Sequence, residues 1–198
     1  MTPEILAEIK KIETLEGWCS FEKASAMANI ILNTKPAVSV ELGVFGGRSL
    51  IAQGIALKHA GSGVVWGIDP WTKDANVEGE LNTANKGWWG NLDIAAIRNG
   101  AISAITQFDL WNWVRVIVAR SEHCNELFGP IDVLHIDGNH SETCSTRDVN
   151  IWLPKVVKGG FVWFDDMDWP ETQKARKIVE SVCDPVITVG NCQLYRKR

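Results

Sequence analysis

The sequence has no surplus of positive charge, no long apolar run and no paired cysteine motif. Its 198 residues include 20 Lys and Arg against 24 Asp and Glu, which gives a formal net charge of −4. Binding to a phosphate backbone depends on a basic surface that releases counterions. Nucleic acid is therefore not expected as a partner.

The apolar segments are short. None approaches the roughly 20 residues that cross a bilayer, so no membrane partner is expected. The start, MTPEILAEIKKIETLEG, mixes acids into an amphipathic pattern and lacks the basic beginning and apolar centre of a signal peptide. The five cysteines form no CxxC pair, which is typical of ordinary thiols in a reducing compartment. We therefore expect a cytoplasmic protein.

Length and composition predict one domain over residues 1–198. With 45% hydrophobic residues, the chain can fill one core but is short for two. It contains no repeat, low-complexity segment or linker. We expect helices in residues 1–36, a core domain over 37–198 and a tryptophan-rich connection over 71–113.

Five short and almost continuously apolar segments predict strands that are covered on both faces. They are AVSVELGV (37–44), GVVWGIDP (63–70), VRVIVARS (114–121), IDVLHIDG (131–138) and GFVWFDD (160–166). Helical spacing is found at 5–12, 21–32, 49–59, 91–107, 142–157 and 171–182. The alternation predicts an α/β fold, a single doubly wound Rossmann-like domain with a mostly parallel sheet. PVITVG and CQLYRKR suggest two last strands, with an antiparallel strand at the C-terminus.

Polar or glycine-rich residues follow each of these five strands. The carboxyl ends of parallel strands share one edge of the sheet, where ligands bind. The sequence therefore predicts one shared pocket. Its candidate residues at the strand ends are Glu41, Asp69, Ser121, Asp137, Asp165 and Asp166. Each one alone could instead be a helix cap or a turn former.

The first strand end, VELGVFGGRSL, is the most specific. Glu41 is followed by Gly43, Gly46 and Gly47, and Ser49 opens a helix. Glycines let the backbone pass close to a ligand, and a helix N-terminus presents free N–H groups to an anion. A tight strand-to-helix turn is the structural alternative. The G-x-G-x-x-G spacing of nicotinamide-binding proteins is not matched, so an NAD(P)-dependent oxidoreductase is the weaker functional alternative.

The pattern E-x-G-x-x-x-G-x-S, formed by Glu41, Gly43, Gly47 and Ser49, resembles motif I of class I S-adenosylmethionine-dependent methyltransferases. It is most similar to the metal-dependent, catechol O-methyltransferase-like group. The stretches GPIDVLHIDGNHSE and DVNIWLPKVVKGGFVWFDD resemble the bacterial family related to macrolide-sugar and cephalosporin-pathway O-methyltransferases. The likeness covers residues 37–169. It implies methylation of a hydroxyl on a small molecule, such as a sugar, a glycoside or a phenol.

The resemblance implies a cofactor site for S-adenosylmethionine. Asp69 is expected to bind the ribose hydroxyls, and Ser121 and Glu122 are expected to contact the adenine. Trp71 would flank the adenosine. The full set of expected cofactor-binding residues is Glu41, Gly43, Gly47, Ser49, Asp69, Trp71, Ser121, Glu122 and Asp137.

The resemblance also implies a metal and a base. Asp137, Asp165 and Asp166 are the expected ligands of Mg²⁺ or another divalent cation, because three clustered carboxylates otherwise repel one another. Such a cation would lower the pKa of the acceptor hydroxyl. His140 is the expected general base, since an imidazole titrates near pH 6.5. The alternatives are a turn role for His140, a capping role for the paired acids and competition by Asp168.

Five tryptophans crowd the connection between the second and third strands: Trp71, Trp88, Trp89, Trp111 and Trp113. Packing is one explanation. A lid is the other, because long connections at this edge of a sheet often cover ligands. Trp88 and Trp89 would then stack on a sugar or an aromatic ring. A cofactor-binding module without catalysis is a further alternative, and the sequence leaves a homo-oligomer open.

Overall fold

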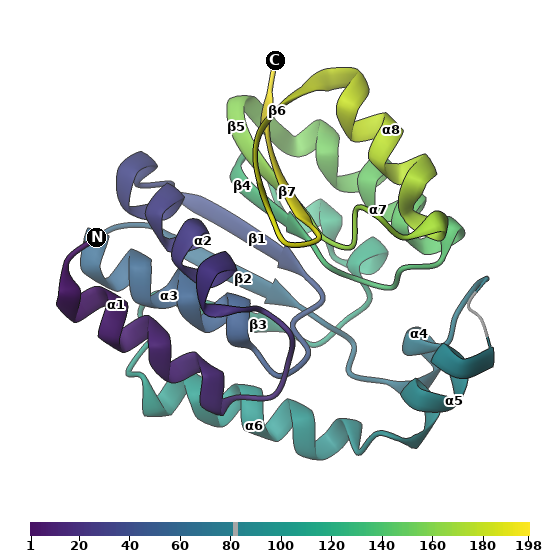
Figure 1. The fold of residues 1–198 in the computed structure, drawn as a ribbon, viewed down its shortest axis with the longest axis horizontal. Helices are drawn as coiled ribbons and strands as arrows, with labels where there is room; N and C mark the ends of the chain where they lie inside the picture. Colours follow the sequence, from purple (N-terminus) through teal and green to yellow (C-terminus); the bar gives the residue numbers. More distant parts are fainter. Residues whose placement is uncertain (81–82) are drawn as a thin grey trace.

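A computed structural model describes residues 1–80 and 83–198, and for 83–86 it gives the backbone alone. Seven strands form one sheet in the order β3-β2-β1-β4-β5-β7-β6 (Figure 1). The strands are β1 Val38–Leu42, β2 Val64–Ile68, β3 Val114–Ile117, β4 Ile131–Ile136, β5 Val156–Phe164, β6 Cys183–Val189 and β7 Cys192–Lys197. Strands β1 to β5 are parallel, and β7 is antiparallel to both β5 and β6. The predicted Rossmann-like sheet with an antiparallel C-terminal strand is confirmed.

Helices cover both faces of the sheet (Figure 1). The helices are α1 Pro3–Lys10, α2 Phe21–Thr34, α3 Arg48–Ala60, α4 Lys73–Asn76, α5 Thr83–Asn91, α6 Ile94–Gln107, α7 Glu142–Trp152 and α8 Gln173–Val182. Helices α1, α2, α3 and α6 share one apolar core with the sheet, and α7 and α8 share a second core on the opposite face. Helices α4 and α5 lie away from both cores, in the connection after β2 (Figure 1).

Alternation along the strands decides which side chains meet the helices. Successive residues of a strand point to opposite faces of the sheet. Leu42 of β1 and Phe164 of β5 pack in the core beneath α7 and α8. Glu41, next to Leu42, therefore faces α2 and α3. Trp163 of β5 packs in the core on that side, so the next residue with the same orientation, Asp165, also points toward α2 and α3.

Two predicted boundaries are wrong. The helix expected over 142–157 ends at Trp152, because Pro154 has no N–H to continue the helical hydrogen bonds. Strand β5 consequently begins at Val156. No helix was expected over residues 71–90 of the connection after β2, but α4 and most of α5 lie there. Residues 81 and 82 of this connection lie outside the described residues.

The described residues include no helix with the length and apolar character that a bilayer crossing requires. All five cysteines are buried and free.

Candidate active site

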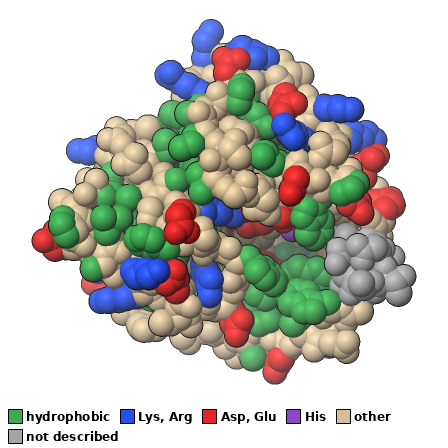
Figure 2. Space-filling model, in the orientation of Figure 1, with side chains coloured by type: hydrophobic (Ala, Val, Ile, Leu, Met, Phe, Trp, Pro, Cys, Tyr) green, Lys and Arg blue, Asp and Glu red, His purple; other side chains and the backbone are tan. Residues whose placement is uncertain are grey.

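A cavity of about 500 Å³ lies at the carboxyl edge of the sheet. Residues that follow each of the first five strands line it: Gly43, Asp69, Ser121, Asp137 and Asp165. The prediction of one shared pocket is thus confirmed. Figure 2 shows a hollow in this face of the molecule with charged side chains inside it and hydrophobic side chains on its rim. The volume is within the range of small-molecule sites.

The glycine turn after β1 forms one wall of the cavity. Gly43 has a φ of 83°, and a Cβ there would lie 2.0 Å from the carbonyl oxygen of Asp137. Only glycine fits so close to a neighbouring strand end. Gly47, with a φ of 91°, is the N-cap of α3 and supplies no capping side chain. The first N–H groups of α3 are therefore available to a ligand in the cavity.

Asp69 fastens this turn to the end of β2. Its Oδ2 accepts hydrogen bonds from the backbone N–H groups of Val44 and Phe45, both at 2.9 Å, and its Oδ1 accepts one from Trp71 at 2.7 Å. Burial raises the pKa of Asp69, although these bonds lower it. A carboxylate has about four acceptor positions, so roughly one stays available to a ligand. Trp71 is held by its Nε1, which donates to the carbonyl of Phe45 at 2.9 Å.

Glu41 lies behind the cavity wall, completely buried. Its carboxyl accepts hydrogen bonds from Ser49 Oγ at 2.8 Å and Gln53 Nε2 at 2.6 Å, and Nδ1 of His135 lies 3.2 Å from its Oε2. Burial raises the pKa of Glu41 to about 8 and lowers that of His135 to about 3. At neutral pH a protonated Glu41 therefore donates to a neutral His135, whose Nε2 donates to Asp165 at 3.2 Å. The structure places Glu41 in this network and not among the residues that could touch a cofactor.

Lys23 of α2 contacts the same network at Asp165. Its ammonium forms an ion pair with Asp165 and lies 3.8 Å from Oδ2 of Asp137. Burial lowers the pKa of Lys23, but nearby acidic groups, with Asp137 foremost, outweigh this effect and raise it, so the side chain is charged. This residue was not among those predicted from the sequence. The available signal was its position on the apolar face of the helix, beside Met27 and Ile31.

His140 pairs with Asp166 on the opposite side of the cavity floor. Its Nε2 lies 2.8 Å from Oδ2 of Asp166, and its ring packs edge-on against Trp169 with a centroid distance of 4.9 Å. Burial lowers the pKa of His140, but the hydrogen bond and the charge of Asp166 raise it further, so that the net shift is upward. The side chain therefore contacts a carboxylate, contrary to the alternative of a turn residue bonded to backbone.

The three expected metal ligands do not share one arrangement. Asp137, His140 and Asp166 each offer a ligand atom within 4.8 Å of the others. Asp165 is not part of this group, because its Oδ2 contacts Lys23 and His135 instead. The alternative that the paired acids cap the following helix is wrong, since Thr172 occupies the N-cap position of α8.

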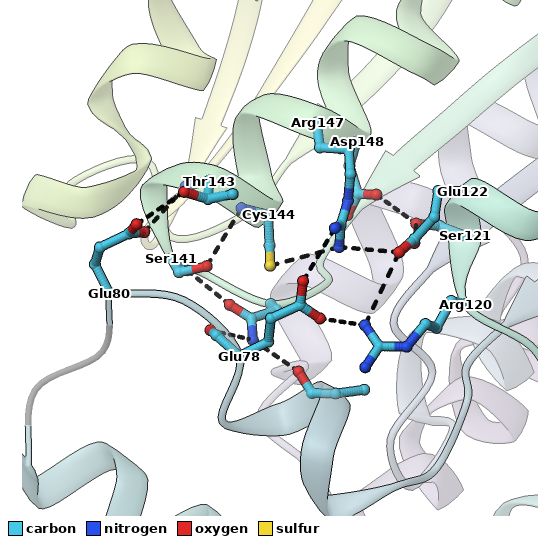
Figure 3. Close-up of polar contacts among 12 residues, drawn as sticks. Glu78, Glu80, Arg120, Ser121, Glu122, Ser141, Thr143, Cys144, Arg147 and Asp148 are labelled. Carbon is cyan, nitrogen blue, oxygen red and sulfur yellow. Dashed lines mark hydrogen bonds and ion pairs between the residues drawn. The ribbon is translucent and has the colours of Figure 1, made fainter.

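A ring of alternating charges closes the far end of the cavity (Figure 3). Glu78 contacts Arg120 through one oxygen and Arg147 through the other, at 3.0 Å for Arg147. Arg147 in turn lies 3.3 Å from Glu122. Two glutamates and two arginines thus neutralise one another. Glu122, an expected adenine contact, is part of this ring.

Ser121, the other expected adenine contact, lies beside the ring. Its hydroxyl donates to Asp148 of α7 (Figure 3). Burial raises the pKa of Asp148 to about 6, although the bond from Ser121 lowers it. Ser121 lines the cavity, so its hydroxyl remains within reach of a ligand.

Further contacts hold the connection after β2 against the cavity. Asn139 donates to the backbone carbonyls of Ala75 at 2.8 Å and Glu78 at 3.1 Å. Glu80 accepts a hydrogen bond from Thr143 Oγ1 at 2.8 Å (Figure 3). Residues 75–80 are thus attached to the segment that follows β4. They form a wall of the cavity and not a free loop.

Aromatic side chains form the cavity mouth. Trp18 stacks on Phe45 with a centroid distance of 4.9 Å, and Trp88 and Trp89 meet edge-on at 4.9 Å. All four line the cavity, and Trp18 is 66% exposed. The connection tryptophans therefore divide: Trp71, Trp88 and Trp89 are at the cavity, while Trp111 and Trp113 lie elsewhere. Trp18, which comes from the loop before α2, was not predicted from the sequence.

Comparison with known proteins assigns this chain to a family. A family model described as "Methyltransferase domain" matches residues 40–167, which is more than half of the chain. The chain belongs to this methyltransferase family. The match sets aside the oxidoreductase alternative. No curated protein matches the chain in sequence.

Solved methyltransferase structures share the fold of this methyltransferase domain. The SAH-bound methyltransferase PaMTH1 from Podospora anserina has a TM-score of 0.68 at 13% identity, covering 100% of this chain and 89% of that protein. The O-methyltransferase from Bacillus cereus in complex with SAH has a TM-score of 0.64 at 16% identity, with 100% and 92% covered. The O-methyltransferase TomG from Streptomyces achromogenes, involved in tomaymycin synthesis and in complex with SAM, has a TM-score of 0.65 at 16% identity, with 100% and 91% covered. The expected methyltransferase fold is confirmed.

Proposed function

We propose that this methyltransferase uses S-adenosylmethionine to methylate a hydroxyl group of a small molecule. One observation carries the proposal: the glycine turn after β1 and the cluster of Asp137, His140 and Asp166 line the same cavity. A methyl donor and an acceptor can therefore meet inside it. The three structural neighbours support the choice of donor, because each was solved with SAM or its product SAH.

The donor would lie along the edge formed by β1, β2 and β3. Its methionine carboxylate suits the uncapped N-terminus of α3 beyond Gly47, which attracts anions. Asp69 has about one acceptor position left for a ribose hydroxyl. Ser121 and Glu122 would meet the adenine, and Trp71 would flank the adenosine. Ser49 lines the cavity, and Glu41 would support the site from behind through its hydrogen bond with Ser49.

Methyl transfer then needs an acceptor oxygen beside the sulfonium. The bound donor would supply its methyl group to that oxygen and be released as S-adenosylhomocysteine. The hydroxyl proton would pass to His140 acting as general base. Asp166 would stabilise the imidazolium that forms, because it already faces the ring at 2.8 Å. The same pairing means that His140 becomes a neutral base only above its raised pKa.

A divalent cation such as Mg²⁺ fits the cavity with a changed ligand set. Asp137 and Asp166 present carboxylate oxygens, the ligands that Mg²⁺ prefers, and their ligand atoms lie within 4.8 Å of each other. Asp165 stays a predicted ligand, but in this structure its carboxylate contacts Lys23 and His135. When bound, the cation would lower the pKa of the acceptor hydroxyl.

The acceptor class follows from the cavity mouth. Trp18, Trp88 and Trp89 offer flat surfaces on which a phenol, a sugar or a glycoside could stack. The five free buried thiols suit the cytoplasm, where cysteines stay reduced. We therefore propose a cytoplasmic enzyme acting on a small hydroxylated molecule.

A labelled-methyl assay tests the proposal. The protein is incubated with methyl-labelled S-adenosylmethionine and a library of phenols, sugars and glycosides, and O-methylated products are identified by mass spectrometry. We expect label in at least one hydroxylated compound, and much less with His140→Ala. Tight cofactor binding without transfer to any compound would favour the non-catalytic binding module.

A further inference from the structure

Lys23 is a charged residue buried among the carboxylates of the proposed metal site. We propose that Lys23 is the resident cation of this cluster: it occupies Asp165 and restricts any divalent cation to Asp137 and Asp166. The inference deepens the proposed function, because it concerns the composition of the same site.

The first argument is the position of the pair. Lys23 belongs to α2, which covers the face of the sheet toward which Asp165 points. The side chains of Lys23 and Asp165 are only 9% and 4% exposed. Removing two charges from water is costly unless they pair closely, so a pair buried this deeply is held as a unit.

The second argument is the hydrogen-bond capacity of Asp165. Its Oδ2 meets the ammonium of Lys23 and Nε2 of His135, the latter at 3.2 Å. Its Oδ1 accepts a bond from the backbone N–H of Asp166 at 3.3 Å. Both oxygens thus have protein partners. A metal that binds Oδ2 of Asp165 would have to displace the lysine.

The positive charge of Lys23 also acts on Asp137. Lys23 also lies 3.8 Å from Oδ2 of Asp137, whose side chain is 28% exposed and lines the cavity. A fixed positive charge at this distance repels a divalent cation and weakens its binding. The lysine therefore lowers the affinity of the site for metal as well as changing its ligands.

Binding of Mn²⁺ alone, as a probe for divalent cations, tests the inference without cofactor or acceptor. Calorimetric titrations would compare wild type with Lys23→Met, which keeps the length of the side chain but not its charge. We expect Lys23→Met to bind Mn²⁺ at least about tenfold more tightly, because three carboxylates are then uncompensated. Lys58→Met, which removes a surface lysine 3.6 Å from Asp109, is the matched control and should behave like wild type.

A second variant decides the ligand set even if Lys23→Met does not fold. Asp165→Asn should weaken Mn²⁺ binding only a few-fold, through the uncompensated charge of Lys23, whereas Asp137→Asn should weaken it strongly. Equal Mn²⁺ affinity of wild type and a folded Lys23→Met, or loss of Mn²⁺ binding in Asp165→Asn, would overturn the inference. These outcomes are independent of methyl transfer, so failure of the proposed function would be seen separately in the labelled-methyl assay.

Discussion

The imidazole of His140 and the carboxylate of Asp166 form a direct pair, with Nε2 and Oδ2 separated by 2.8 Å. They come from the ends of neighbouring parallel strands, β4 and β5. The pair fixes the orientation of the ring and favours its protonated form. It therefore sets the pH at which His140 can accept a proton.

The first prediction is that the pKa of His140 depends on Asp166. Nuclear magnetic resonance titration in EDTA should place it above the ordinary value of 6.5. Asp166→Asn removes the charge that stabilises the imidazolium and should lower the pKa. Because the base must be neutral, methyl transfer by wild type should fall as the pH drops through the raised pKa. An unchanged pKa in Asp166→Asn would refute the assigned pairing.

The second prediction concerns Glu41 and stability. Its pKa rises from 4.5 to about 8 on folding, so the folded state binds more protons than the unfolded state between these values. The Glu41 contribution to stability is therefore full below pH 4.5 and is lost as the pH rises toward 8. Glu41→Gln cannot ionise, so it should not lose stability in this way. Its free energy of unfolding, compared with that of wild type, should therefore rise by about 1 kcal/mol or more from pH 5 to pH 8.

Urea unfolding of both proteins across that pH range measures the effect. The neutral amide can be accommodated because Gln53, whose Oε1 has no hydrogen-bond partner among the described residues, can rotate to accept from it. Parallel pH profiles for Glu41→Gln and wild type would show that Glu41 is ionised in the fold.

The third prediction is that Gly43 tolerates no side chain. A Cβ would lie 2.0 Å from the backbone oxygen of Asp137, and the φ of 83° is unfavourable for other residues. Gly43→Ala should lower the free energy of unfolding by roughly 2 kcal/mol or more. Gly100 of α6 has open space around its Cα, so Gly100→Ala should be neutral or stabilise by about 0.5–1 kcal/mol. Thermal unfolding measures the stability of both variants. An equal change in stability for Gly43→Ala and Gly100→Ala would contradict this explanation.

The fourth prediction concerns the charge ring. Glu78→Gln should weaken its contacts with Arg120 and Arg147 and loosen the connection after β2. Trypsin cleavage after Lys73 should then be faster than in wild type, since local opening exposes the chain to protease. Glu142→Gln, which disrupts a surface pair with Lys174, is the control for loss of a glutamate charge. Equal cleavage rates in all three proteins would mean that the ring does not hold the connection.

Much of the architecture was predictable because strand and helix patterns are local. The short apolar strands and their polar ends predicted both the parallel sheet and the shared pocket. The orientation of Asp165 was also accessible in principle, because it continues the alternation of β5, whereas Asp166 leaves that alternation with a positive φ of 48°. The partners of these carboxylates could not be predicted. Lys23 and Asp165 are brought together by the packing of α2 on the sheet, which no local sequence pattern records.

The same limit applies to Glu41 and Trp18. A motif identifies Glu41 as important, but only the packing of α3 shows that its carboxyl contacts Ser49 and Gln53 behind the cavity. Trp18 lies in a loop and reaches the cavity through contacts with Phe45 and Trp88. Both are decided by tertiary structure. The single-domain organisation and the functional role of each site residue stay predictions.

The central claim is that this cavity binds S-adenosylmethionine, and calorimetric titration with S-adenosylhomocysteine tests it most directly. Wild type should bind one equivalent and show no binding of NADH. Asp69→Ala should bind more weakly by roughly 1.5–3 kcal/mol, because the mutation would remove the proposed charge-assisted hydrogen bond to the ribose and does remove the anchor of the glycine turn. Absence of S-adenosylhomocysteine binding by folded wild-type protein, or equal affinity in a folded Asp69→Ala, would contradict the account.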